Sequence, residues 1–382
     1  MKVDPLNTPS NQAGLYIHIP FCVRKCGYCS FYSVQSVKLI PKYLTALQRE
    51  MEFYSSHLKS FDTIYLGGGT PSLFTPKQLE AIFVTINRYY KIDPHAEITI
   101  EVNPGDVSLK YFQSLRSLGI NRLNIGIQSF DNQLLKFLGR RHSAADAVTA
   151  IDYARAAGFT NIGIDLIYGV HHQNINLWKC TIQQAVSFTP EHISCYQLSL
   201  EAKTPLYKKY NQDGLKLPSE GEQLEYFLAT DEELGNAGYL HYEVSNFARA
   251  QNLRSRHNMK YWQHIPYLGL GPGAHSFIDN KRWWNKSALK TYLKEITAGK
   301  MPLENTEALT MEQLQLEALF LGMRMKAGID LELYKAKYGA DLLTDRKTII
   351  DELIKNKLLE LKDVFLRPTL AGMAVADSLA LI

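Results

Sequence analysis

The chain has 382 residues, of which 46% are hydrophobic and 21% charged, a composition typical of a globular enzyme and unlike a disordered chain. Its formal net charge of +4 is too small to indicate nucleic-acid binding without a clustered basic face. No apolar run reaches the roughly 18 residues of a membrane span, and the N-terminus has no apolar signal segment. We therefore expect a cytoplasmic protein with reduced cysteines.

The first half of the chain alternates predicted strands and helices. Strands are predicted at 15–19, 63–66, 97–102, 122–128, 161–168 and 192–200, and helices at 42–58, 75–90, 108–118, 132–138, 144–157 and 175–188. This alternation predicts an α/β fold with a parallel sheet and right-handed crossovers. An open doubly wound sheet and a partial (β/α)6 barrel both fit, and in either one the chemistry gathers at the carboxyl ends of the strands.

After residue 201 this alternation ends. A long helix at 220–234 and an extended stretch at 239–247 precede 246–285, which is rich in aromatic residues, His and Gly but shows no clear period. Helices at 311–325, 331–338 and 346–358, an extended piece at 359–367 and a last helix from 370 suggest a small winged-helix-like domain. We accordingly expect a short polar N-terminal segment at 1–14, a barrel at 15–240, a connecting region at 241–305 and a mainly helical C-terminal domain at 306–382.

Three of the five cysteines, Cys22, Cys26 and Cys29, directly follow the first predicted strand. Structural zinc needs four closed ligands, and no fourth Cys or paired His lies at finger spacing. A three-thiolate site leaves one position open, which favours an iron–sulfur cluster over zinc or over unrelated reduced cysteines. Cys180 and Cys195 fall in a helix and a strand, and we expect both to be buried free thiols.

The spacing Cys-x3-Cys-x2-Cys, with Tyr28 before the last cysteine, resembles the signature of the radical S-adenosylmethionine (SAM) superfamily. The fuller string at 15–31, LYIHIPFCVRKCGYCSF, resembles the branch that contains oxygen-independent coproporphyrinogen III oxidase and the HemW-type haem chaperones. The resemblance implies a partial barrel of radical SAM type and a [4Fe–4S] cluster on the three cysteines. It also implies that SAM chelates the open iron and is cleaved to a radical there, while the protein holds the cofactor and excludes water.

The same resemblance implies which residues hold SAM. The matching positions are Tyr16, Tyr28, Gly68, Gly69, Thr70, Glu101, Gln128, Arg140 and Asp165. Glycine in the turn at 67–71 allows the backbone to approach the methionine amino group, and Arg140 can pair with the methionine carboxylate. Each polar residue alone is more often solvated or structural. Their shared place at strand ends favours the functional interpretation.

Two features separate the oxidase from the chaperones. Phe31 stands where the oxidase has a further cysteine, and only about 14 residues precede the first strand, in place of the longer arm of the oxidase. Both differences count against coproporphyrinogen decarboxylation, which stays the alternative function. We assign no side chain a catalytic role.

The segment His257–Trp262, HNMKYW, matches the HNxxYW motif that the chaperone branch links to haem. An imidazole can ligate haem iron, a helix would place Tyr261 on the same face as His257, and Tyr261 and Trp262 can pack on a porphyrin. The alternative is a capped turn whose aromatic residues fill the core. The resemblance implies haem binding and transfer to an acceptor haemoprotein of unknown identity. For the C-terminal domain, a docking surface for a haem acceptor or a membrane partner is favoured over a DNA-binding winged helix. Nucleic-acid binding is not expected, because the helix at 346–358 mixes lysines with acidic residues.

Overall fold

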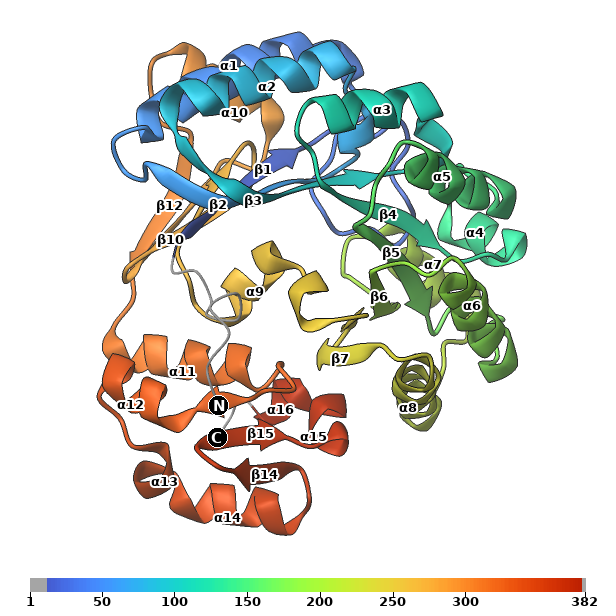
Figure 1. The fold of residues 1–382 in the computed structure, drawn as a ribbon, viewed down its shortest axis with the longest axis vertical. Helices are drawn as coiled ribbons and strands as arrows, with labels where there is room; N and C mark the ends of the chain where they lie inside the picture. The colour runs from blue at the N-terminus through green and yellow to red at the C-terminus, as the bar shows by residue number, and fades with distance from the viewer. Residues whose placement is uncertain (1–11, 380–382) are drawn as a thin grey trace.

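A computed structural model describes residues 12–379, which form one twelve-stranded sheet and a separate three-stranded sheet. Strands β1 to β6 lie side by side in chain order and pair in parallel. Helices α1 to α6 cover the outer face of this curved sheet (Figure 1). The predicted (β/α)6 core is therefore confirmed. The strands are β1 (Ala13–Ile19), β2 (Ser60–Gly68), β3 (Lys91–Val102), β4 (Arg122–Gln128), β5 (Ile162–Tyr168) and β6 (His192–Gln197), and the helices are α1 (Ile40–Tyr54), α2 (Pro76–Tyr89), α3 (Leu109–Ser117), α4 (Asn132–Leu138), α5 (Ala144–Ala156) and α6 (Ile175–Ser187).

Side-chain caps fix where these helices begin. Thr75 and Gln78 form a reciprocal capping box at the start of α2, with Pro76 at the first helical position. The side chains of Asp131 and Ser143 cap α4 and α5 by accepting backbone N–H groups of the first helical turn. The β-to-α turns are thus tightly defined, and these turns carry the candidate site.

The second half of the chain extends both edges of the sheet. Beyond β6, an antiparallel pair is added, and beyond β1 a parallel strand and then an antiparallel meander are added. These strands have six residues or fewer, too short to show a clear period of two, which explains why 246–285 gave no regular pattern. The added strands are β7 (Leu240–Glu243), β8 (Asn246–Ala248), β9 (Tyr267–Leu270), β10 (His275–Ile278), β11 (Lys281–Asn285) and β12 (Leu303–Ala308).

One helix of this half lies on the concave side of the sheet. Helix α9 (Arg256–Trp262) contacts β1 and β2 on one side and α11 (Met311–Gly322) on the other, and Figure 1 shows it between the barrel and the C-terminal helices. The remaining helices are α7 (Pro205–Asp213), α8 (Glu220–Asn236) and α10 (Leu289–Thr297). Neither α7 nor α10 was predicted.

The C-terminal helices and the three-stranded sheet enclose a hydrophobic cluster of their own. The predicted helices and β-ribbon of this region are confirmed, with ends shifted by a few residues. The elements are α11, α12 (Leu331–Tyr338), α13 (Leu342–Asp345), α14 (Lys347–Lys355), α15 (Leu370–Ala374), α16 (Ala376–Leu379), β13 (Ile329–Asp330), β14 (Leu359–Lys362) and β15 (Phe365–Pro368). Within residues 12–379 no helix has both the length and the apolar character needed to cross a membrane.

Two further sequence predictions concern the limits of the domains and the two isolated cysteines. The domain limits stay predictions, and most of the predicted segment at 1–14 lies outside the described residues. Cys195 is buried as predicted, but Cys180 is exposed. The prediction for Cys180 was wrong because α6 buries Trp178 and Ile182, and a residue two positions from each points to the opposite side of a helix.

Candidate cofactor site

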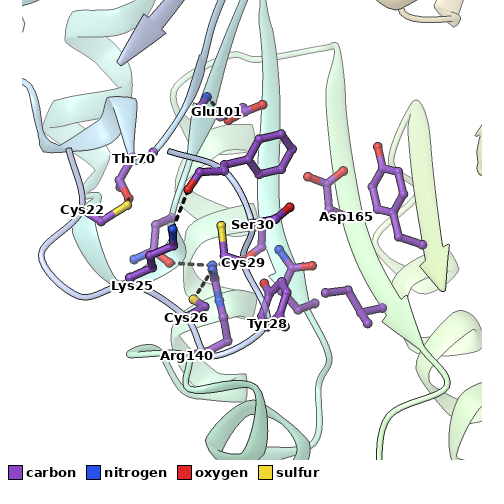
Figure 2. Close-up of a pocket in the computed structure, with 18 of the residues that line it drawn as sticks. Cys22, Lys25, Cys26, Tyr28, Cys29, Ser30, Thr70, Glu101, Arg140 and Asp165 are labelled. Carbon is purple, nitrogen blue, oxygen red and sulfur yellow. Dashed lines mark hydrogen bonds between the residues drawn. The ribbon is translucent and has the colours of Figure 1, made fainter. Parts of the chain in front are cut away.

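A cavity of about 530 Å³ lies at the carboxyl ends of the barrel strands, within the size range of small-molecule sites. Figure 2 shows the three cysteine side chains on one loop, with Glu101 and Asp165 across the cavity from them. Every residue predicted for the cluster and for SAM lines this cavity except Tyr16. The strand-end rule indicated this location for Glu101, Gln128 and Asp165, and the family resemblance indicated the other positions.

The cysteine loop is held by the backbone around it. Cys22 N–H donates to the carbonyl of Val34, and Cys29 N–H donates to the carbonyl of Cys26. The N–H of Leu206, at the start of α7, donates to the carbonyl of Gly27 at 2.9 Å. Helix α7 therefore supports the loop from the far side of the barrel mouth.

Hydrogen-bond donors and a cation surround the thiols. Thr70 Oγ1 donates to Cys22 Sγ at 3.4 Å, and Arg140 Nη1 donates to Cys26 Sγ at 3.5 Å. Burial raises the pKa of the Cys29 thiol. The thiolate is the form of cysteine that binds metal, and a positive guanidinium lies beside one of these sulfur atoms.

The thiol arrangement fits a cluster better than a single ion. Within the described residues, no group of three or more His, Cys, Asp or Glu side chains is arranged to hold one metal ion. In a four-iron cluster each thiolate binds a different iron, so its ligands are spread around a larger body. Three thiols along the wall of a cavity of this size, with Arg140 to offset their charge, fit a cluster and a small ligand beside it.

The glycine turn at the end of β2 packs directly against the cysteine loop. A Cβ atom at Gly69 would lie 2.6 Å from the carbonyl oxygen of Phe21, so only glycine fits there. Gly69 N–H donates to the carbonyl of Ile19, and Thr70 N–H donates to the carbonyl of Phe21. Gly68 adopts a φ of 108°, which side chains rarely tolerate. The turn thus fixes the start of the cysteine loop as well as one wall of the cavity.

Two partly buried carboxyl groups lie on the opposite wall. Glu101 accepts the hydroxyl of Tyr65 at 2.9 Å and the N–H of Gly68 at 3.0 Å, and Asp165 accepts Asn124 Nδ2 at 2.6 Å. Burial, and secondarily the charge of Asp165, raises the pKa of Glu101 to about 7. Burial likewise raises the pKa of Asp165 to about 6. Two acids held in this way are suited to a cationic ligand or to hydroxyl groups.

Some polar atoms at the cavity remain available for a ligand. Among residues 12–379, no partner bonds the buried Oδ1 of Asp165 or the buried Nε of Arg140. Gln128 ends β4 with a φ of 69°, a conformation that is rare outside glycine and is found disproportionately at functional sites. Buried polar atoms normally have partners, so these residues fit a polar molecule in the cavity.

Tyr16 lies in the layer beneath the cavity. Its hydroxyl pairs with His18 Nδ1 at 3.0 Å, and its ring lies next to those of Tyr65 and His257. Tyr16 is therefore close to the site but is not among the described residues that line the cavity.

The HNxxYW segment also lies in this inner layer. Helix α9 places His257 and Tyr261 on one face, as predicted, and their side chains are hydrogen-bonded at 2.8 Å. His257 is 1% exposed, and its other nitrogen pairs with Thr63 Oγ1 at 2.8 Å. Trp262 faces the other way, with the guanidinium of Arg324 over its ring. Both ring nitrogens of His257 are engaged and the ring is enclosed, and its role as a haem ligand stays a prediction.

Sequence reasoning missed several residues around the cavity. Asn124, Tyr65 and Tyr196 line it, and each occupies a strand position that points to the concave side, two or four residues from a predicted site residue or strand end. A polar or aromatic side chain at every second position of an otherwise apolar strand was the available signal. Thr63 and Glu97 occupy the same alternating positions, but the pattern could not show that their partners lie on α9.

Known proteins with sequences similar to this chain agree with a radical SAM site in this cavity. Residues 16–184 match the model of the radical SAM superfamily, and residues 309–375 match the HemN C-terminal domain. Haem chaperone HemW of Bacillus subtilis is 35% identical over 349 residues, which cover 90% of this chain and 92% of that protein. The chain belongs to the HemW family.

Other relatives widen this HemW comparison. Haem chaperone HemW of Synechocystis is 36% identical over 82% of this chain and 78% of that protein. The radical S-adenosyl methionine domain-containing protein 1, mitochondrial, of Danio rerio is 30% identical over 98% of this chain and 88% of its own. The solved structure of coproporphyrinogen III oxidase (HemN) from Escherichia coli superposes with a TM-score of 0.85 over 98% of this chain and 91% of its own, at 22% identity. That structure supports the shared fold of HemW and HemN proteins and nothing finer.

Proposed function

We propose that this protein is a haem chaperone, which binds haem and transfers it to an acceptor haemoprotein. The observation that carries the proposal is the 35% identity to haem chaperone HemW of Bacillus subtilis across about nine-tenths of both chains. Phe31, which occupies the position of the additional cysteine of the oxidase, supports it further. The alternative, SAM-dependent decarboxylation of coproporphyrinogen III, is kept as an outcome of the test.

The resident cofactors in this proposal are a [4Fe–4S] cluster and SAM. Cys22, Cys26 and Cys29 would hold the cluster, which with SAM supplies one-electron chemistry when bound. Glu101, Asp165 and Arg140 would orient SAM, since the carboxylates can accept its hydroxyl and amino groups and the guanidinium can pair with its carboxylate. The predicted SAM-binding roles of Tyr16, Tyr28, Gln128 and the glycine turn belong to the same proposal.

Haem is the cargo in this proposal, and its site is left unassigned. A neutral imidazole has one lone pair for a hydrogen bond or a metal, and that of His257 is already paired with a hydroxyl group. Burial, followed by the charges of Lys260 and Arg122, lowers the pKa of His257 to about 3, so the ring is neutral at physiological pH. The predicted haem contacts of His257, Tyr261 and Trp262 stay predictions, and ligation of iron by His257 would require one of these hydrogen bonds to break.

The proposal is tested by titrating haem into the purified protein and then offering the complex to a haem-depleted acceptor enzyme. We expect about one haem per chain and recovery of acceptor activity. The same preparation, with its cluster, SAM and a reductant, is assayed with coproporphyrinogen III, and little or no conversion is expected. Robust SAM-dependent decarboxylation without haem binding would replace the chaperone with the oxidase. Haem binding without transfer would leave a haem-binding protein and reject the chaperone role.

The partners beyond haem stay part of the proposal. The acceptor haemoprotein is not identified, and peripheral contact with a membrane stays a prediction. The expected cytoplasmic location and the expected lack of nucleic-acid binding are predictions in the same sense.

A further inference from the structure

We infer that His257, with Tyr261, is a positioning residue of the SAM site and not a ligand of haem iron. The inference rests on the proposed binding of SAM in the cavity. It is carried by a continuous set of contacts that joins α9 to Glu101 through Tyr65.

The first link is the way in which His257 is held. Thr63 Oγ1 and Tyr261 Oη bond its two ring nitrogens, each at 2.8 Å. The backbone N–H of His257 donates to Oε1 of Glu97 at 3.0 Å. The space around the ring is also filled, since a Cβ atom at Gly14 would lie 3.1 Å from its Cε1. A side chain fixed at both ends of its ring and at its backbone has one orientation.

The second link joins His257 to Tyr65. Their rings stack with centroids 5.2 Å apart and planes 27° from parallel. Thr63 and Tyr65 are two positions apart on β2, so their side chains point to the same, concave side of the sheet. His257 contacts both. Tyr65 is 8% exposed, so the orientation of its ring is set by these neighbours.

The third link reaches the cavity. The Tyr65 hydroxyl donates to Oε1 of Glu101, and the Gly68 N–H donates to Oε2, which fixes the carboxyl group from two sides. Glu101 lines the cavity and is one of the two acids that face the proposed SAM site. Removing the imidazole would release the Tyr65 ring and with it one of the two bonds that orient Glu101.

The base of α9 is anchored separately from this chain of contacts. Asp62 pairs with Lys260 Nζ at 2.7 Å and with Arg256 at 3.1 Å, and Glu97 accepts the N–H groups of the first helical turn. Loss of the His257 side chain therefore leaves these anchors of the helix in place. This separation makes the inference testable without unfolding α9.

The experiment compares the full-length wild-type protein with His257→Ala, His257→Gln and Tyr65→Phe, and with His264→Ala as a control. His264 is likewise buried and bonded to a tyrosine hydroxyl, Tyr338 at 3.1 Å, but lies at the C-terminal helices. Haem stoichiometry and the Soret spectrum are measured on cluster-free protein. SAM affinity is measured by calorimetry of cluster-loaded protein. The electron paramagnetic resonance spectrum of the reduced cluster, with and without SAM, is recorded as well.

We expect His257→Ala to keep the haem stoichiometry and the Soret spectrum of the wild type while its SAM affinity falls about 2- to 30-fold, the size usual for indirect coupling. Tyr65→Phe should give a similar loss, and the double variant should lose less than the product of the two single effects because both act through Glu101. The SAM-induced change in the cluster spectrum should shrink in parallel. His257→Gln, which can keep both hydrogen bonds, should recover much of the affinity, and His264→Ala should not change it.

A Soret shift in His257→Ala with unchanged SAM affinity would overturn the inference and restore His257 as the haem ligand. Equal SAM affinity in all variants would also overturn it. If the wild type itself binds no SAM, the proposed SAM site fails and the inference falls with it. If the wild type binds SAM but no haem, only the chaperone proposal fails, and the SAM measurements still decide the role of His257.

Discussion

The two ends of the barrel differ in how their charges are arranged. At the carboxyl ends of the strands, Glu101 and Asp165 face a cavity with raised pKa values, and polar atoms of Asp165 and Arg140 lack partners among residues 12–379. At the amino ends, Asp62 faces Lys260 and Arg256.

This difference suggests that the carboxyl ends of the strands bind ligands and that the amino ends stabilise the fold. Polar groups that stay under-satisfied in a cavity gain free energy when a ligand supplies the missing partner. Charges already paired inside the protein gain nothing from a ligand, and removing one of them leaves the other buried alone. The carboxyl end of the barrel, hereafter the upper end, should therefore respond to ligands and pH. At the amino end, hereafter the lower end, mutations should change the stability of the protein.

The largest expected effect is loss of the cluster. Cys26→Ala removes one of three thiolates, so anaerobic reconstitution should yield little iron and sulfide, with the loss of the cluster absorption. Cys180→Ala is the matched control, because Cys180 is exposed on α6, away from the loop, and should reconstitute like the wild type. A full, spectrally unchanged cluster in Cys26→Ala would reject the three-cysteine assignment.

The next effect is on stability at the lower end. Asp62→Ala leaves Lys260 buried without its partner, and breaking such a pair costs about 3–5 kcal/mol of the free energy of unfolding. The measurement is the urea midpoint of cluster-free protein. Asp351→Ala removes an exposed pair with Lys347 and should cost less than about 1 kcal/mol. Similar midpoints for the two variants would show that the lower end is not a structural anchor.

At the upper end, Arg140→Ala should weaken SAM binding about 10- to 100-fold, which corresponds to one charge-assisted hydrogen bond of about 1.5–3 kcal/mol. Calorimetry is normalised to cluster content, because Arg140 also contacts Cys26. Arg282→Ala serves as the control, since its partner Glu317 lies on α11. Unchanged affinity in Arg140→Ala would remove the arginine from the SAM site.

The smallest expected effect is the pH dependence of SAM affinity. Partial burial raises the pKa of Glu101 to about 7, and a cationic ligand favours its ionised form. Binding thus releases a proton below pH 7, so affinity should rise as pH increases from 6 to 8, by at most about tenfold per pH unit. Glu101→Gln should flatten this rise relative to the wild type. The titration of SAM itself is the same in both experiments, so the difference between the two slopes reports on Glu101. Identical slopes would exclude Glu101 as the titrating group.

The sequence predicted more of the upper end than of the lower end. The upper end followed from local patterns: strand, cysteine loop, glycine turn and the polar residue at each strand end. The rule that parallel strands present their carboxyl ends together indicated where Asp165, Glu101 and Gln128 would lie, and the family resemblance indicated their role. The structure added the inward neighbours Asn124 and Tyr65, which a stricter use of the period of two would have indicated.

The lower end depends on pairs that no local pattern contains. His257 and Thr63 are 194 residues apart, and the helical period predicted the shared face of His257 and Tyr261 but not what that face contacts. The motif was therefore recognised while its surroundings were not. Helix α7 was missed for a different reason, since its polar sequence has no buried stripe and its packing on the cysteine loop is set by a backbone hydrogen bond at Leu206.

The strand order has a consequence for the chain as it is made. Strand β1 pairs with β2 on one side and with β9 on the other, and β9 is synthesised roughly 250 residues after β1, about 10–50 s later at usual elongation rates. Until then β1 presents an open edge of N–H and C=O groups flanked by apolar residues such as Leu15 and Ile17, a template for pairing with another chain. A chain that stops before Tyr267 contains all six barrel strands and the cysteine loop, yet it keeps this edge open and should aggregate on release from the ribosome.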